Sequence, residues 1–332
     1  MLLQSVRELK LEVAGEVYQS LRDDILNRGF QPRVGSSLRP SPLHRLALGI
    51  ALGRTPGEFS LAIRLQRQSP PLQALVERLK ERAHNDVDVA FVGVPRAQDD
   101  AAPAPADLKK KMRPIVVGCS IGHIAATGGT LGLIARHRKT GHAVMLSNSH
   151  VLALSGRGVS GDPITQPGRV DGGGQDTIVG ALLDSTPLKS DSPNLADAAI
   201  AMIGDDVPFS VNSVPGLGQF TIGDEGAILL GAKVQKIGRT TGLRRGEVTA
   251  IELDDVGVEY DTGEFHFDKQ LEIRGEPGLP FSADGDSGSL VFDAQMRAIG
   301  LVFAGNPELD ERGVSFANHL PTVMTMLDLI PL

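Results

Sequence analysis

The chain has 332 residues, of which 41% are hydrophobic and 22% are charged, and its formal net charge is -7. This length and composition predict a globular protein of about two domains of roughly 150 residues each. The negative charge, the low aromatic content and the absence of tryptophan argue against nucleic acid as a partner, because the phosphate backbone would be repelled and stacking surfaces would be scarce.

A single cysteine, Cys119, excludes an intramolecular disulfide, and its strand-like surroundings predict a small buried side chain. The first residues lack a basic segment followed by an apolar run, so we expect no secretory signal. No stretch approaches the roughly 18 continuous apolar residues of a membrane span. We therefore expect a cytoplasmic protein with no membrane partner.

Residues 4–28 predict an amphipathic helix that ends at Gly29. Its apolar residues recur every three or four positions and are Val6, Leu9, Val13, Val17, Leu21 and Ile25. We expect this stripe to pack on the chain's own body. A surface for homo-oligomerisation through the N-terminal region is the alternative.

Residues 46–95 predict a small β-α-β unit, with strands over 58–65 and 87–94 and a helix over 71–83. Together with the first helix this unit forms a predicted N-terminal domain over residues 1–95. No glycine-rich phosphate loop joins the first strand to the helix, so regulation, assembly or plain packing are the roles to consider. Residues 96–113 are rich in proline, alanine and charge and predict a linker that includes Lys109–Lys111.

Short alternating strands separated by glycine, proline, asparagine and aspartate recur from residue 114 to the end, and this pattern predicts a β-sandwich or β-barrel. A short helix is expected over 322–329. The predicted strands are 115–119, 130–136, 143–147, 177–183, 198–203, 233–237, 247–253, 271–274, 290–292 and 298–303.

A candidate nucleophile lies in the turn Gly285-Asp286-Ser287-Gly288 that leads into an apolar strand. The flanking glycines allow a tight turn that exposes a hydroxyl while main-chain N–H groups converge on one point, which is what acyl transfer requires. An ordinary hairpin turn is the alternative interpretation of the same residues.

Two further residues could complete a catalytic site. His150 follows the apolar strand over 143–147, where a side chain is held firmly and can still face a cleft. Asp197 begins the strand over 198–203, which suits a partly buried acid that orients an imidazole.

In the chain order His150, Asp197, Ser287, these motifs resemble the chymotrypsin or trypsin-like serine proteases over residues 113–332. The segment 234–242, with Gly-Arg-Thr-Thr-Gly, resembles bacterial α-lytic and streptogrisin-type members. Ser-Ile-Gly-His at 120–123 and Ser-Asn-Ser-His at 147–150 look like the intracellular group that includes the plant narrow-leaf-type proteases.

The resemblance implies a mainly β fold, a chymotrypsin-like double β-barrel over 114–332, behind the small N-terminal α/β domain. It implies a Ser287 nucleophile, a His150 base, an orienting Asp197 and an oxyanion hole made by the N–H groups of Gly285 and Ser287. Asp286 then needs a cationic or hydrogen-bonded partner, and the motif suggests Lys236. A solvated basic ribbon is the alternative role for that lysine.

The same resemblance places Phe281 at the base of the primary substrate pocket and the residues Phe303, Ala304 and Gly305 along its wall. Because a trypsin would carry an acid at this base, we expect cleavage after small to medium apolar residues. Phe303 stands where relatives often place a hydroxyl that supports the triad acid, so another group must satisfy Asp197.

The histidines show no metal-ligand spacing, so we predict no metal and no other cofactor. The expected activity is that of a serine endopeptidase acting on protein or peptide substrates. The competing hypotheses are a non-catalytic scaffold or peptide-binding module with the same fold, and a latent protease, esterase or self-cleaving protein that would cut near Lys109–Lys111.

Overall fold

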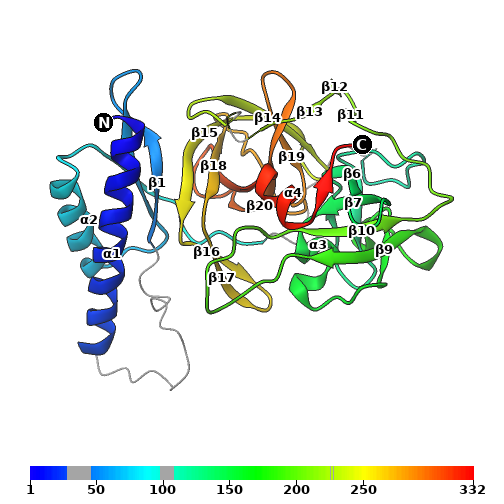
Figure 1. Ribbon diagram of the computed structural model, residues 1–332, viewed down its shortest axis with the longest axis horizontal. Coiled ribbons are helices and arrows are strands. Elements are labelled where there is room, and N and C mark those ends of the chain that lie inside the picture. The colour runs from blue at the N-terminus through cyan, green and yellow to red at the C-terminus, as the bar shows by residue number, and fades with distance from the viewer. Residues whose placement is uncertain (28–45, 98–107, 225, 227) are drawn as a thin grey trace.

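A computed structural model describes residues 1–27, 46–97, 108–224, 226 and 228–332. Figure 1 shows three parts along the longest axis: an N-terminal α/β unit, a β-barrel in the centre and a curled sheet at the opposite end. Leu21 and Ile25 of the predicted first helix have side chains outside the described set. Most of the predicted linker, residues 98–107, also lies outside the described residues.

The sheet at the far end has eight strands in the order β22-β6-β7-β10-β9-β8-β4-β5 and curls around its own apolar core. The free thiol of Cys119 lies in this core, and burial raises its pKa to about 12. The strands are β4 (Ser120–His123), β5 (Gly129–Thr130), β6 (Leu133–His137), β7 (Ala143–Ser147), β8 (Pro163–Thr165), β9 (Ile178–Ser185), β10 (Ala199–Ile203) and β22 (Leu329–Ile330).

The central part is a closed barrel of six strands, because β14 pairs with β19 on one side and with β15 on the other. In chain order the curled eight-stranded sheet is the first barrel and this closed barrel is the second. The strands are β14 (Lys233–Gly238), β15 (Gly242–Asp254), β18 (Gln270–Gly275), β19 (Leu290–Asp293), β20 (Arg297–Asn306) and β21 (Val314–His319). One apolar cluster joins residues of both sheets, including Leu146 and Leu290, with the helix α4 (Leu320–Met326). The expected chymotrypsin-like double β-barrel is therefore confirmed.

Smaller elements connect these sheets. A hairpin of β16 (Val256–Tyr260) and β17 (Gly263–Phe267) projects from the second barrel, and β13 (Thr221–Ile222) pairs in parallel with β20. The remaining elements are the helix α3 (Ser149–Leu152), the strands β11 (Ser213–Val214) and β12 (Gly218–Gln219), and 3-10 turns at Leu154–Gly156, Arg169–Asp171 and Gln175–Thr177.

The N-terminal unit contains α1 (Leu3–Asn27), β1 (Leu46–Leu52), β2 (Phe59–Leu65), α2 (Pro70–Arg82) and β3 (Val87–Phe91). Both helices cover one face of the three strands (Figure 1), and one apolar cluster unites them with alternate residues of β1 and β2. Because Val6, Val13 and Val17 belong to this cluster, the apolar stripe of the first helix packs on the chain's own body, as expected. The predicted β-α-β unit is confirmed as β2-α2-β3.

The opposite face of the three strands packs on the second barrel. β1 pairs with the end of β15, so the sheet of the N-terminal unit continues that of the barrel. The small side chains of Ala47, Ala51 and Ala62 pack here against aromatic residues of the barrel. Buried Arg64 crosses the same face and pairs with Glu272 of β18 at 2.7 Å. The unit is thus packed against the barrel through a continuous sheet and a buried ion pair.

Three of the element predictions were wrong in detail. Residues 115–119 form no strand, because Gly118 takes a φ of 92° in a turn and only Ile115 makes an isolated bridge. The stretch 130–136 is interrupted between β5 and β6, and the last helix covers 320–326 rather than 322–329. The hairpin β16–β17 and the strands β1, β4, β8 and β21 were missed.

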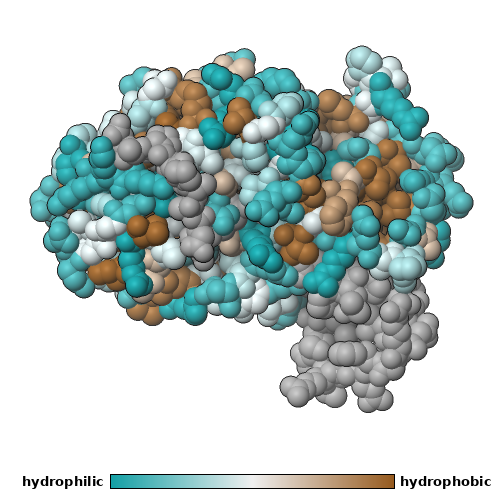
Figure 2. Space-filling view, turned by 180° about the vertical axis from the view of Figure 1, so that it is seen from behind, coloured by the Kyte–Doolittle hydropathy of each residue, from teal (hydrophilic) through white to brown (hydrophobic). Residues whose placement is uncertain are grey.

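Figure 2 shows the face opposite to Figure 1, where hydrophilic residues cover most of the surface and hydrophobic ones form separate patches. The most exposed large hydrophobic residues are scattered along the chain: Leu2 precedes α1, Leu11 lies in α1, and Val159 and Leu229 lie in loops. Among the described residues, no helix combines the length and the apolar character needed to cross a membrane.

Candidate active site

The strands β7 and β10 place His150 and Asp197 side by side. The strands pair antiparallel, with Ala199 opposite Ser147, so the residues just after β7 lie beside those just before β10. The helix α3 begins directly after β7 and carries His150 in its first turn. His150 Nδ1 lies 2.5 Å from Asp197 Oδ2, and the Asp197 side chain is fully buried.

The buried carboxylate of Asp197 has further donors. The N–H groups of Ser149 and His150 donate to Oδ1 at 2.7 and 3.3 Å, and the hydroxyl of Tyr260 donates to Oδ2 at 2.9 Å. Burial, followed by the negative charge of Asp197, raises the pKa of Tyr260 well above its ordinary value, so this hydroxyl stays protonated. Tyr260 therefore supplies the hydroxyl that Phe303 cannot.

Side-chain amides fix the main chain around this acid. Asn148 donates to the carbonyl of Asp197 at 2.7 Å, and the N–H of Asp197 donates to Asn318 Oδ1 at 3.0 Å. Asn318 in turn donates to Gln270 at 2.8 Å. Both barrels thus contribute groups that hold Asp197 in place.

The turn that carries Ser287 lies between the barrels. Gly285 and Gly288 have φ values of 87° and 91°, which a residue with a Cβ adopts only with strain. The N–H of Thr130 in the first barrel donates to the carbonyl of Ser287 at 2.8 Å. A Cβ at Gly288 would lie 2.2 Å from the hydroxyl of Ser147, so the turn packs closely on the strand that leads to His150.

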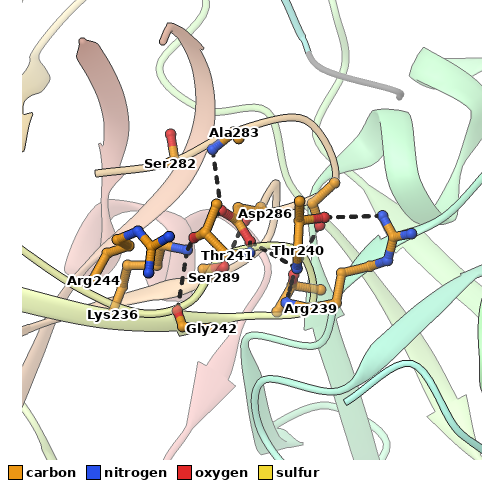
Figure 3. A network of polar contacts seen from close by, with 12 residues as sticks. Lys236, Arg239, Thr240, Thr241, Gly242, Arg244, Ser282, Ala283, Asp286 and Ser289 are labelled. Atoms are coloured by element: carbon orange, nitrogen blue, oxygen red, sulfur yellow. Dashed lines mark hydrogen bonds and ion pairs between the residues drawn. The ribbon is translucent and has the colours of Figure 1, made fainter. Parts of the chain in front are cut away.

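Asp286 in the same turn is fully buried and is surrounded by donors (Figure 3). Lys236 Nζ lies 2.7 Å from Asp286 Oδ2, and Thr241 Oγ1 donates to the same oxygen at 2.6 Å. The N–H groups of Thr240 and Thr241 donate to Oδ1 at 3.0 and 3.1 Å, and that of Ala283 donates to Oδ2 at 3.1 Å. The structure thus brings together the predicted partners Lys236 and Asp286.

Two opposing effects act on the pKa of Asp286. Burial raises it, whereas the Lys236 ammonium and the hydrogen bonds of Thr241 lower it, and the net direction is downward. Burial also lowers the pKa of Lys236, which acts against the charged pair. Because the carboxylate accepts from several fixed N–H and O–H donors besides the lysine, we conclude that the pair is ionised.

Sequence reasoning missed the role of Arg239 in the Gly-Arg-Thr-Thr-Gly segment. Its buried guanidinium donates to both carboxylate oxygens of Asp171 at 2.7 and 3.0 Å, and Ser120 donates to the same acid at 2.6 Å. A Cβ at Gly285 would lie 1.9 Å from Arg239 Nη1, so this side chain backs the turn directly (Figure 3). Nothing in the Gly-Arg-Thr-Thr-Gly segment itself signals a partner 68 positions away in the sequence.

The three predicted pocket residues lie in different surroundings. Phe281 is fully buried among apolar side chains of the second barrel, and Ala304 packs in the cluster that reaches the N-terminal unit. At Gly305 a Cβ would lie 2.6 Å from the carbonyl of Val314, so only glycine fits there. The hydroxyls of Ser282 and Ser315 lie nearby and are 2.7 Å apart. The assignment of the substrate pocket stays a prediction.

A cavity of about 180 Å³ adjoins His150. Residues of both barrels line it, and so does Ala97, the last described residue before 98–107. The lining includes His150, Tyr260, Leu154, Arg157, Asp261 and Ala97. Within the described part of the chain, no cluster of three or more histidine, cysteine, aspartate or glutamate side chains could hold a metal ion.

No protein-family model and no curated protein matches the chain. Solved structures that resemble it are bacterial serine proteases of the chymotrypsin type. Cellulomonas bogoriensis chymotrypsin is 17% identical over 66% of this chain and 98% of its own, with a TM-score of 0.44. Thermobifida fusca Protease A is 16% identical over 66% and 98%, with a TM-score of 0.46. A glutamic acid-specific serine protease is 19% identical over 66% and 100%, also with a TM-score of 0.46.

Proposed function

We propose that the chain is a serine endopeptidase that hydrolyses peptide bonds through a Ser287–His150–Asp197 triad. One observation supports this above all others: a buried carboxylate, held by Tyr260 and by two N–H groups, lies 2.5 Å from His150 Nδ1, and the glycine-flanked turn of Ser287 packs on the strand that leads to His150. A carboxylate on Nδ1 fixes the imidazole so that its other nitrogen can accept a proton.

In the proposed reaction, Ser287 Oγ attacks the carbonyl carbon of the scissile bond while His150 takes its proton. The C–N bond then breaks as His150 returns that proton to the leaving amine, which yields an acyl-enzyme. Water, deprotonated by His150, attacks the ester and releases the new carboxylate and Ser287. Asp197 stays ionised and stabilises the imidazolium in both steps.

The N–H groups of Gly285 and Ser287 are proposed to bind the oxyanion of each tetrahedral intermediate. Losing one such donor typically costs about 10²–10³ in turnover. Their direction depends on the turn, which Asp286 holds through Lys236, Thr240 and Thr241. An internal lysine can thus do what a newly cleaved N-terminus does in secreted relatives.

The substrates are proposed to be proteins or peptides cut after small to medium apolar residues. The support is chemical: the predicted pocket positions Phe281, Ala304 and Gly305 carry no charge, and the neighbouring hydroxyls of Ser282 and Ser315 bond to each other. A set of chromogenic tetrapeptides that differ only in the last residue checks this, with alanine, valine or leucine expected above arginine and glutamate.

Labelling with a fluorophosphonate probe tests the triad. We expect mass spectrometry to find the adduct on Ser287, to lose it in Ser287→Ala and His150→Ala, and to retain it in His142→Ala, which changes an exposed histidine just before β7. Absence of labelling in the folded wild-type chain would reject the protease in favour of a non-catalytic scaffold.

A further inference from the structure

The segment that follows β3 runs along the end of β20. Asn306 Nδ2 donates to the carbonyl of Val92 at 3.4 Å, and a Cβ at Gly93 would lie 2.6 Å from the same nitrogen. Three residues after Gly93, Arg96 lies beside Gly305, one of the predicted wall residues of the substrate pocket. The described part of this segment ends at Ala97.

Arg96 pairs with Gly305 as an antiparallel strand would. The N–H of Arg96 donates to the carbonyl of Gly305 at 3.1 Å, and the N–H of Gly305 donates to the carbonyl of Arg96 at 3.2 Å. On its other side the segment bonds to β16, where Ala97 N–H donates to the carbonyl of Glu259 and Glu259 N–H donates to that of Pro95, both at 3.1 Å. The segment 95–97 is therefore inserted between two strand edges.

This edge of β20 is open to a third strand because β19 stops short of it. β19 pairs with β20 only as far as Leu290 opposite Leu301, whereas β21 covers the other side of Gly305. The Arg96 side chain is 75% exposed and lies 3.6 Å from Glu259, so the main chain provides the closer contacts. Pairing through main-chain bonds at a strand edge is how extended peptides are bound with little dependence on sequence.

The next residue lies toward the catalytic pair. Ala97 lines the cavity of about 180 Å³ together with His150 and Tyr260. Arg96 on the predicted wall strand and Ala97 at the cavity that adjoins His150 thus lie in the order that two successive residues of an extended peptide would have along this edge. A small side chain suits this narrow space.

We propose that residues 95–97 occupy the peptide-binding edge of the protein's own cleft, so that an external peptide must displace them before it can be cut. This inference rests on the proposed protease function, because the edge matters only if peptides enter there. A main-chain hydrogen bond replaces a bond to water and so contributes only modestly to binding, which lets a few of them hold the segment in place and still allows a peptide to displace it.

The test compares Arg96→Pro with Arg96→Ala in the full chain. Proline removes the N–H that bonds to Gly305, whereas alanine keeps it and removes only the exposed side chain. We expect kcat/KM for an apolar chromogenic tetrapeptide to be about five- to tenfold higher in Arg96→Pro than in Arg96→Ala, because one main-chain bond of the competing segment is lost. The fluorophosphonate probe has no extended main chain, so its rate of labelling at Ser287 should be equal in both.

The outcomes separate the two proposals. No labelling in any variant rejects the protease, whereas equal labelling with equal kcat/KM in both Arg96 variants rejects the occupation of the edge by residues 95–97. A second measurement does not depend on Arg96→Pro folding: hydrogen exchange of the Ala97 amide in Ser287→Ala, with and without a saturating uncleaved tetrapeptide. Faster exchange with peptide is expected, and unchanged or slower exchange would contradict displacement.

Discussion

Two buried carboxylates flank the proposed active centre, and they are satisfied in different ways. Asp197 in the first barrel accepts hydrogen bonds from neutral N–H groups, from Tyr260 and from the imidazole of His150. Asp286 in the second barrel accepts N–H and O–H donors as well, but it also has the ammonium of Lys236 at 2.7 Å. Both side chains are fully buried.

This difference in partners determines what the negative charge of each carboxylate can do. A buried carboxylate with only neutral fixed donors keeps its negative charge in an environment of low dielectric, where it strongly favours a cation on a neighbouring imidazole. A carboxylate that is already paired with an ammonium has its charge neutralised, and it serves to hold the backbone in one conformation. We therefore expect changes at Asp197 to reduce activity, and changes at the Lys236–Asp286 pair to reduce both stability and activity.

The largest effect is expected for Asp197→Asn. The amide keeps the shape but lacks the charge, and it favours the wrong tautomer of His150, so kcat for a tetrapeptide should fall by about 10⁴. The free energy of unfolding, measured in urea, should change far less than in the Lys236 variant below. Asp184→Asn, an exposed change on the adjacent strand β9, is the control and should leave kcat unaltered. A fall below tenfold in Asp197→Asn would argue against its place in the triad.

Lys236→Met should have the largest effect on folding. It leaves Asp286 as an uncompensated buried charge, so the free energy of unfolding in urea should drop by about 3–5 kcal/mol. The double variant Lys236→Met, Asp286→Asn removes that charge and should regain part of the loss while activity stays low, because the turn has lost its anchor. The control is Lys233→Met, whose side chain is 76% exposed, and it should shift stability by less than about 1 kcal/mol.

Wild-type stability and wild-type labelling of Ser287 in Lys236→Met would show that the neutral donors alone hold Asp286. Both carboxylates would then be satisfied in the same way, by neutral groups alone. A loss of labelling without a loss of stability would instead place Lys236 in the chemistry rather than in the support of the turn.

Sequence reasoning located the centre of the proposed site because its signals are local. His150 and Asp197 lie at the ends of recognisable apolar strands, and Ser287 is flanked by glycines whose backbone conformation requires them. The β-α-β unit could be predicted for the same reason, since helix and strand periodicities appear within ten or so residues. Lys236 was suggested only through the motif around it.

Tyr260 and the segment 95–97 could not be predicted in this way. Tyr260 reaches Asp197 from a hairpin 63 positions away, and nothing in the alternation of residues 256–267 specifies that contact. Arg96 pairs through its main chain, which has the same donors and acceptors in any residue except proline. Contacts of this kind depend on how the barrels and the N-terminal unit pack, which local patterns do not encode.

The hairpin that supplies Tyr260 has an ionic anchor of its own in His266. Burial lowers the pKa of this histidine, but hydrogen bonds and attraction from Asp255 at 2.7 Å and Glu264 at 3.2 Å raise it to about 9. Because the folded pKa exceeds the unfolded value of about 6.5, the stabilisation is fully present below about pH 6.5 and is lost as the pH rises through about 9.

We therefore expect His266→Gln to cost about 1–3 kcal/mol of unfolding free energy at pH 6 and much less at pH 10. Urea unfolding of wild type and variant at both values isolates the contribution of this residue, and His142→Gln serves as an exposed control. An equal loss at both pH values would mean that His266 acts through packing or neutral hydrogen bonds. A loss of activity that follows the loss of stability would connect the hairpin to Asp197.

Tyr260→Phe removes one of the neutral donors of Asp197 and keeps the ring that lies 5.8 Å from the imidazole of His150. We expect kcat to fall by about tenfold, because the carboxylate loses one of the three donors that fix its position and then holds the imidazole less firmly in the orientation that accepts the Ser287 proton. KM should change little. The carboxylate, with one donor fewer, should attract the imidazolium more strongly, so the acid limb of the kcat/KM profile should move to higher pH.

Phe267→Leu loosens the same hairpin without touching the carboxylate, so it should lower stability and leave that limb in place. If both variants moved the limb equally, Tyr260 would be a packing residue, and the hydroxyl that Phe303 lacks would have to come from elsewhere.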